Sequence, residues 1–145
     1  MTHRLTLRNL AATATATVAL LSFATLAHAE GCAQVEVRNL RPAQGALMLA
    51  AYSDAASFRK TAVSQLQVAV TGETMQLQVC GLTGNAVALT LFQDLNGNGK
   101  LDSNPFGLPI EPWGASGKSS MFSAPTWDTA QVPLDGSTIV VLLSK

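Results

Sequence analysis

From Cys32 onward, apolar and polar residues alternate, and this two-residue period constrains the fold more than any other feature of the sequence. In the segment 33–40, Val35 and Val37 fall on one face of an extended strand, and the polar residues Gln34, Glu36 and Arg38 fall on the other. A two-residue period is typical of a β-strand with one buried face, whereas an amphipathic helix repeats about every 3.6 residues. The chain is therefore expected to fold as an all-β protein.

Six segments have the length and composition of strands, and turn residues separate them at intervals of roughly ten residues. They are 33–40, 46–52, 65–72, 73–81, 86–94 and 137–143, and residues 53–60 are expected to form one helical turn capped by Ser53 or Asp54. This arrangement predicts an antiparallel β-sandwich of about seven strands, with a closed barrel as the alternative. One long irregular loop, from residue 95 to about residue 129, precedes the end of the chain, and loops of that length are often functional.

The first 29 residues have the features of a secretory signal peptide. Two Arg residues precede the apolar segment Leu10–Leu26, and Ala-His-Ala at positions 27–29 fits a small–x–small cleavage site. A membrane anchor is the alternative, but the apolar segment is short and rich in Thr for a bilayer span. We therefore expect a periplasmic or secreted protein with no membrane span after cleavage, and a single domain at residues 30–145.

Cleavage at that site would leave a chain without histidine, because His3 and His28 both lie in the leader. Nucleophilic catalysis that depends on His and zinc sites that contain His are thereby excluded. The cleaved chain keeps seven Lys and Arg against nine Asp and Glu, a net charge of −2, and it has no basic patch. Nucleic acid is therefore not expected as a partner.

Two cysteines remain after cleavage, Cys32 and Cys80. An even pair in an exported chain predicts a disulfide. The alternative is a lipoprotein with Cys32 lipidated, but Glu30 does not fit the small residues expected before a lipidated cysteine.

The nine residues Asp94–Asp102, DLNGNGKLD, carry oxygen-bearing side chains on alternate positions and Gly where a loop must bend sharply. This spacing matches the first half of an EF-hand calcium loop, and calcium takes six to eight oxygen ligands. The expected ligands are the side chains of Asp94, Asn96, Asn98 and Asp102, the backbone carbonyl of Lys100 and the carboxylate of Glu111, with Gly97 and Gly99 forming the turn.

The loop departs from the EF-hand pattern at position twelve, where Pro105 stands in place of Glu and no helix follows. We therefore expect weak, structural calcium binding, with a Kd of roughly 10⁻⁴–10⁻³ M as in extracellular modules. The alternative is a polar turn without an ion, because Asn-Gly pairs form turns readily.

Four aromatic residues follow this loop: Phe106, Trp113, Phe122 and Trp127. Trp113 and Trp127 are candidates for a platform on which a ligand stacks, and the alternative is that the aromatic residues cover an edge of the sandwich. Ser116 and Ser119 lack a histidine base, and a pair of carboxylates could serve a hydrolase. Acidic residues beside Gly and Asn are more often ligands than catalysts, so we expect a protein that is not an enzyme.

Three motifs in this half of the chain resemble those of bacterial exported proteins classed as domain-of-unknown-function family 2141. The motifs are D-x-N-x-N-G-x-L-D, F-G-x-P-x-E-x-x-G and P-x-[FW]-x-x-A. They fall at Asp94, Asn96, Asn98, Gly99, Leu101 and Asp102; at Phe106, Gly107, Pro109, Glu111 and Gly114; and at Pro125, Trp127 and Ala130. The chain departs from the family at residues 115–117, where an aromatic-Ser-Asn run is usual, and in its cysteine pair.

The resemblance implies a periplasmic or secreted β-sandwich of the immunoglobulin or prealbumin type and no established activity. Together with the loop, it favours a calcium-stabilised binding module of the cell envelope whose partner is an envelope protein or glycan. A carboxylate-based hydrolase and a purely structural accessory protein are the alternatives.

Overall fold

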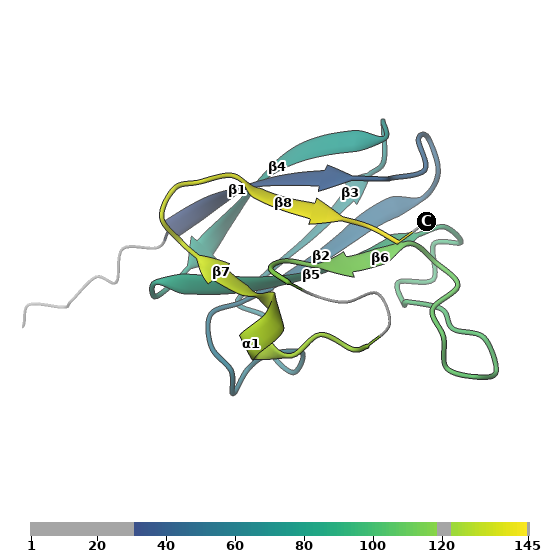
Figure 1. The fold of residues 1–145 in the computed structure, drawn as a ribbon. Coiled ribbons are helices and arrows are strands. Elements are labelled where there is room, and N and C mark those ends of the chain that lie inside the picture. Colours follow the sequence, from purple (N-terminus) through teal and green to yellow (C-terminus); the bar gives the residue numbers. More distant parts are fainter. Residues whose placement is uncertain (1–30, 119–122, 145) are drawn as a thin grey trace, which may run out of the picture.

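A computed structural model describes residues 31–118 and 123–144, so the predicted signal peptide, Ser119 and Phe122 lie outside the described residues. The described elements, in chain order, are β1 (Gly31–Arg38), β2 (Ala46–Tyr52), β3 (Ser64–Ala69), β4 (Thr74–Leu82), β5 (Ala86–Asp94), β6 (Trp113–Ala115), α1 (Trp127–Ala130), β7 (Gln131–Pro133) and β8 (Ile139–Leu142). Figure 1 shows them as two layers of strands with α1 beside one of them.

The strands form two sheets that face each other, which confirms the predicted β-sandwich (Figure 1). One sheet has the order β4-β1-β8, and the other has the order β3-β2-β5-β6 with β7 also paired to β5. All pairings within the sheets are antiparallel except that of β1 with β8, which is parallel. The alternation of the sequence specifies which face of a strand is buried but not the direction of its neighbour.

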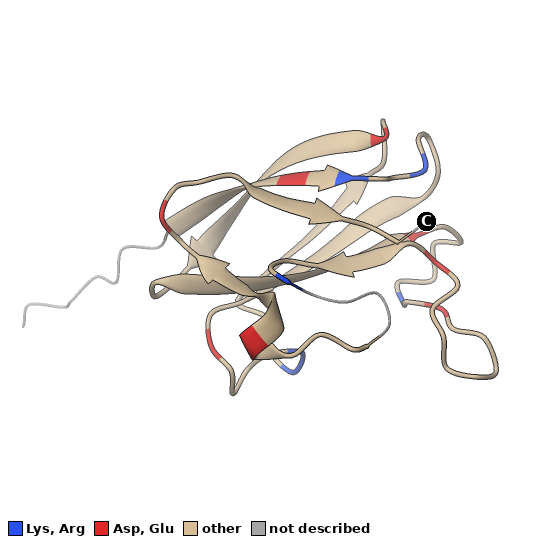
Figure 2. Ribbon diagram, in the orientation of Figure 1, with Lys and Arg blue, Asp and Glu red and all other residues tan. Residues whose placement is uncertain are grey.

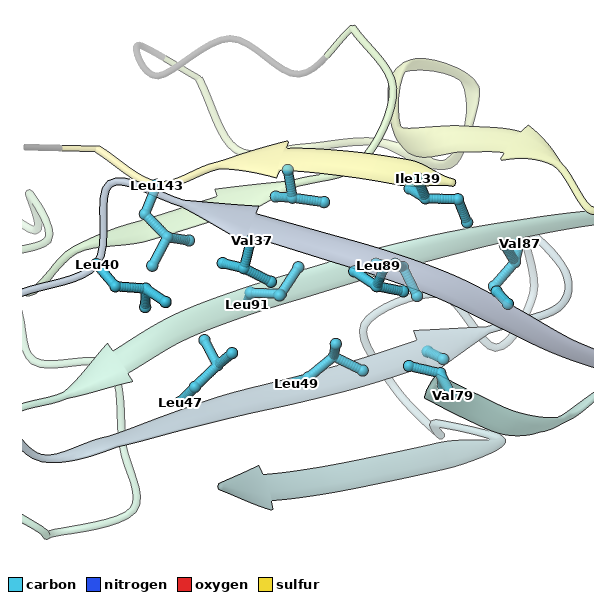
Figure 3. Packing of buried hydrophobic residues seen from close by; sticks show 14 of the residues in the cluster. Val37, Leu40, Leu47, Leu49, Val79, Val87, Leu89, Leu91, Ile139 and Leu143 are labelled. Carbon is cyan, nitrogen blue, oxygen red and sulfur yellow. The ribbon is translucent and has the colours of Figure 1, made fainter. Parts of the chain in front are cut away.

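The core lies between the sheets and consists of aliphatic side chains that alternate along the strands (Figure 3). Val35 and Val37 of β1 and Leu47 and Leu49 of β2 are each at most 3% exposed. Strand β5 is buried along most of both faces, because a second, smaller cluster around Tyr52 and Phe58 covers its other side. This burial explains why the sequence of β5 is almost continuously apolar.

The long connection before the last strands contains two short elements, β6 and α1, that the sequence pattern does not reveal. Strand β6 has three residues and α1 has four, which is too short for a periodic signal. Residues 53–60 form turns in which the side chain of Asp54 accepts a hydrogen bond from the backbone N–H of Ser57 at 2.8 Å. Of the two predicted caps, Ser53 and Asp54, Asp54 therefore caps this turn.

The predicted disulfide between Cys32 and Cys80 is present and joins β1 to its neighbour β4. Both cysteines are exposed, so the bond lies on the outer face of the sheet and outside the core. Among the described residues, no helix is long and apolar enough to cross a membrane.

Candidate functional site: an ordered loop and an apolar finger

The loop that begins at Asp94 is built around the carboxylate of that residue. Asp94 ends β5 and is 1% exposed. Its Oδ1 accepts the backbone N–H groups of Gly97 and Asn98, at 2.8 and 3.2 Å, and its Oδ2 accepts that of Gly99 at 2.7 Å. Gly97 and Gly99 have φ angles of 76° and 75°, which glycine adopts without strain. The carboxylate thus holds the loop curled over the end of β5.

These hydrogen bonds lower the pKa of Asp94 below the ordinary aspartate value of 3.8. The N–H of Gly99 is the largest cause, and the N–H groups of the neighbouring loop residues act in the same direction. Burial raises the pKa but does not outweigh the hydrogen bonds. Asp94 is therefore held as a carboxylate.

The structure brings together three of the predicted ligands, Asn96, Asn98 and Asp102. The amide nitrogen of Asn96 lies 2.6 Å from the Asp102 carboxylate, and that of Asn98 lies 2.9 and 3.0 Å from its two oxygens. The amide oxygens accept backbone N–H groups instead, from Asn98 at 3.1 Å and from Lys100 at 2.8 Å. The Asp102 carboxylate thus accepts hydrogen bonds from two uncharged amide groups of the same loop.

Glu111 lies beneath the loop and joins its two ends. Its side chain is buried, and its Oε1 and Oε2 accept the backbone N–H groups of Leu95 and Asp102 at 2.8 and 3.0 Å. The predicted sixth ligand therefore faces the backbone at the start and the end of the loop. Among the described residues, no group of three or more His, Cys, Asp or Glu side chains is placed to hold a metal ion.

The chain then forms a narrow hairpin, Ser103–Ile110, which we call the finger. Ser103 bridges to Pro109, and the N–H of Ile110 donates to the carbonyl of Asp102 at 2.9 Å. At the tip, Oδ1 of Asn104 accepts the N–H groups of both Phe106 and Leu108 at 3.0 Å. Asn104 was not among the predicted site residues, although an Asn before Pro and Gly is a recognisable turn signal.

The finger exposes large apolar side chains on every second residue. Phe106 is 89% exposed, Leu108 is 62% exposed and Ile110 is 60% exposed, while Glu111, the next residue, is buried. In a strand at the protein surface the outward positions are usually polar, whereas in the finger they are apolar. Figure 2 shows the finger as an uncharged loop that projects beyond the sheets, with charged residues only near its base.

A cleft of about 460 Å³ lies between the finger and the outer face of the sheet formed by β2, β5 and β6. Trp113 lines this cleft, and so do Leu101 and Leu108. Arg59 and Tyr52 also line it, and no carboxylate does among the described residues. The cleft therefore joins the apolar finger to a partly aromatic floor.

Trp127 and Ser116 lie elsewhere and serve the fold. The ring of Trp127 packs edge to face against Phe58, with 6.2 Å between the ring centroids. The buried hydroxyl of Ser116 donates to the carbonyl of Ala130 and accepts the N–H of Leu89 at 2.8 Å, so it fastens α1 to β5. Of the two predicted platform residues, only Trp113 lies at the cleft.

The chain matches the model of a known protein family. The model of a family described as "Uncharacterized protein conserved in bacteria (DUF2141)" matches residues 35–141. Neither the curated proteins nor the solved structures contain a match.

Proposed function

The chain belongs to this bacterial family (DUF2141), and we propose that it is a binding module of the bacterial cell envelope, with a recognition surface ordered by calcium. The surface consists of the finger and the adjoining cleft. Its partner is a component of the envelope, and the protein acts by binding it without chemical conversion.

The observation that carries this proposal is the exposure of Phe106, Leu108 and Ile110 on a segment with a fixed backbone. Exposed apolar side chains are normal when they are scattered singly, but a contiguous group of them marks an interaction site. The Asn104 side chain holds the tip of the finger by hydrogen bonds, and the Glu111 side chain holds the backbone at its base. A surface that is already ordered loses little conformational entropy when it binds.

The chemistry of the cleft favours binding over hydrolysis. A carboxylate-based hydrolase needs two carboxyl groups that flank the bond to be cleaved. The described lining of the cleft contains no carboxylate, and Asp94 and Glu111 nearby are both occupied by backbone N–H groups.

The residues of the loop suit calcium in their donor atoms. Carboxylate, amide and backbone oxygens are hard ligands of the kind that calcium prefers. Asp94, Asn96, Asn98 and Asp102 would hold the ion with their side chains, Lys100 with its carbonyl, and Glu111 would support the site from beneath. The amides of Asn96 and Asn98 would have to turn, because their oxygens now face backbone N–H groups. The ion would supply positive charge to Asp102 and fix the base of the finger.

Binding to isolated envelopes tests the function. Purified protein should co-sediment with a bacterial envelope preparation, and Phe106→Ser should reduce the bound fraction several-fold without changing the melting temperature, because the side chain is 89% exposed. Leu142→Ser, at a 58% exposed residue of β8, is the matched control and should bind as the unaltered protein does. Equal binding of Phe106→Ser and Leu142→Ser would refute the finger as the recognition surface.

A further inference from the structure

We propose that the partner is a phospholipid bilayer and that the finger inserts its tip into it. The side chains of Phe106, Leu108 and Ile110 would enter the boundary between the headgroups and the acyl chains. This inference rests on the proposed function, because it names the partner of the same surface.

The backbone N–H groups of the finger are already paired, as burial in an apolar environment requires of them. A backbone N–H that enters such an environment without an acceptor costs several kcal/mol. From residue 104 to residue 110, every N–H that the chain possesses already has an acceptor within the finger or at its base. Asn104 donates to Leu108 O at 2.8 Å, Gly107 to Asn104 O at 2.9 Å, Ile110 to Asp102 O at 2.9 Å, and Phe106 and Leu108 to Asn104 Oδ1 at 3.0 Å, while Pro105 and Pro109 have no N–H.

The same hydrogen bonds argue against recognition by strand addition. A partner strand that joins a sheet edge is held by hydrogen bonds to free main-chain groups. The finger offers no free N–H between residues 104 and 110, so it cannot donate main-chain hydrogen bonds to a partner strand. Those side chains are apolar and exposed along a projecting hairpin, which a fluid bilayer accepts without a complementary shape (Figure 2).

The charges at the base of the finger complement an anionic membrane. Lys100 and Arg59 are exposed, and Arg59 lines the cleft together with finger residues. Of the nearby carboxylates, Glu111 is buried and accepts backbone N–H groups, and the half-buried Asp102 accepts hydrogen bonds from two side-chain amides. Cations close to a bilayer surface are attracted by anionic headgroups.

Vesicle binding tests the insertion. The purified protein is mixed with vesicles of phosphatidylcholine and with vesicles in which one third of the lipid is phosphatidylglycerol, in EDTA and in calcium. We expect binding to both, stronger to the anionic vesicles, and we expect Phe106→Ser or Leu108→Ser to weaken it about tenfold or more. Leu142→Ser is the control for Leu108→Ser, since the two side chains are 58% and 62% exposed.

A second variant tests the role of the backbone. Asn104→Ala keeps all three apolar side chains but removes the acceptor of two tip N–H groups. It should weaken vesicle binding by a similar factor, whereas Asn85→Ala, at an exposed residue of the turn between β4 and β5, should not. Unchanged binding by Asn104→Ala would contradict the argument from the satisfied backbone.

The depth to which the finger enters the bilayer is measured with the Phe106→Trp variant and brominated phospholipid. Bromine in the upper acyl chains should quench the fluorescence of this variant more than that of the unaltered protein. Absence of vesicle binding, together with envelope binding that protease treatment destroys, would overturn the lipid as partner and leave the proposed function standing. Absence of binding to vesicles and to envelopes would overturn both.

Discussion

Single carboxylates determine how the 94–111 segment is held. Asp94 and Glu111 together accept five backbone N–H groups, and every one of these belongs to the loop between them or to its two ends. Hydrogen bonds to a charged acceptor are stronger than those between neutral groups. The loop at the base of the finger is therefore held largely by two side chains.

Glu111→Gln should destabilise the protein by about 1–3 kcal/mol, because one of its two oxygens is replaced by an NH₂ group that faces a backbone N–H. The shift in the urea midpoint measures this effect. Glu73→Gln, at an exposed residue, is the matched control. Equal midpoints for the two variants would show that Glu111 does not hold the ends of the loop.

Asp94 should make stability depend on pH in acid. Its pKa is lowered in the folded protein by the Gly99 N–H, so its contribution is present above the unfolded value of 3.8 and is lost as the pH falls through the lower folded value. Asp54 and Asp135 have pKa values lowered by hydrogen bonds from Ser57 and Ser137, and they act with the same sign.

The Asp94→Asn variant isolates this contribution. It should be less stable than the unaltered protein near neutral pH and should lose less stability between about pH 5 and pH 2, which urea titrations at several pH values measure. Asp128→Asn, at an exposed residue of α1, is the control. If Asp94→Asn and the unaltered protein lost equal stability between about pH 5 and pH 2, the role assigned to the carboxylate would be contradicted.

At the scale of elements, the sequence predicts the long strands well and the short elements poorly. Strands β1 to β5 have six to nine residues each, enough for alternation or a continuous apolar run to be recognised. Strand β6 forms because its three residues pair with Thr90, Leu91 and Phe92 of β5. This pairing depends on the path of the chain from residue 95 to residue 112, which local sequence does not specify. The direction of β8 was likewise not predictable from its own apolar residues.

The candidate site likewise has one part that the sequence predicts and one part that it does not. The spacing of Asp and Asn predicts a curled loop, and local hydrogen bonds form it. The position of Glu111 depends on the path of the chain through the finger, nine residues beyond Asp102, so the sequence could identify it as a nearby carboxylate but not show which groups it contacts.

The disulfide joins two strands that the sheet already pairs. Replacing Cys32 and Cys80 by Ser should lower the unfolding free energy by about 2–4 kcal/mol and leave the fold intact, because β1 remains paired with both β4 and β8. Urea titration with and without reductant measures this loss. Reductant should shift the midpoint of the unaltered protein and not that of the double variant, and no shift in either would contradict the prediction.

For the whole molecule, a two-sheet sandwich presents an uncharged projection within the connection between β5 and β6 (Figure 2). The sheets enclose the aliphatic core, so the exposed finger adds nothing to it. We propose that calcium orders the base of this projection. An ion that binds only the folded state must raise stability, by about 2.7 kcal/mol when its concentration is a hundred times its Kd.

The most direct test of that claim is the melting temperature in EDTA and in millimolar calcium, with isothermal titration of calcium beside it. Asp102→Asn is the informative variant, because Asp102 accepts side-chain amides and its replacement leaves the hydrogen bonds of Asp94 and Glu111 in place. We predict that calcium raises the melting temperature of the unaltered protein and of Asp128→Asn, and not that of Asp102→Asn. An unchanged melting temperature with no heat of binding would contradict the claim and leave residues 94–102 as a polar loop held by its own hydrogen bonds.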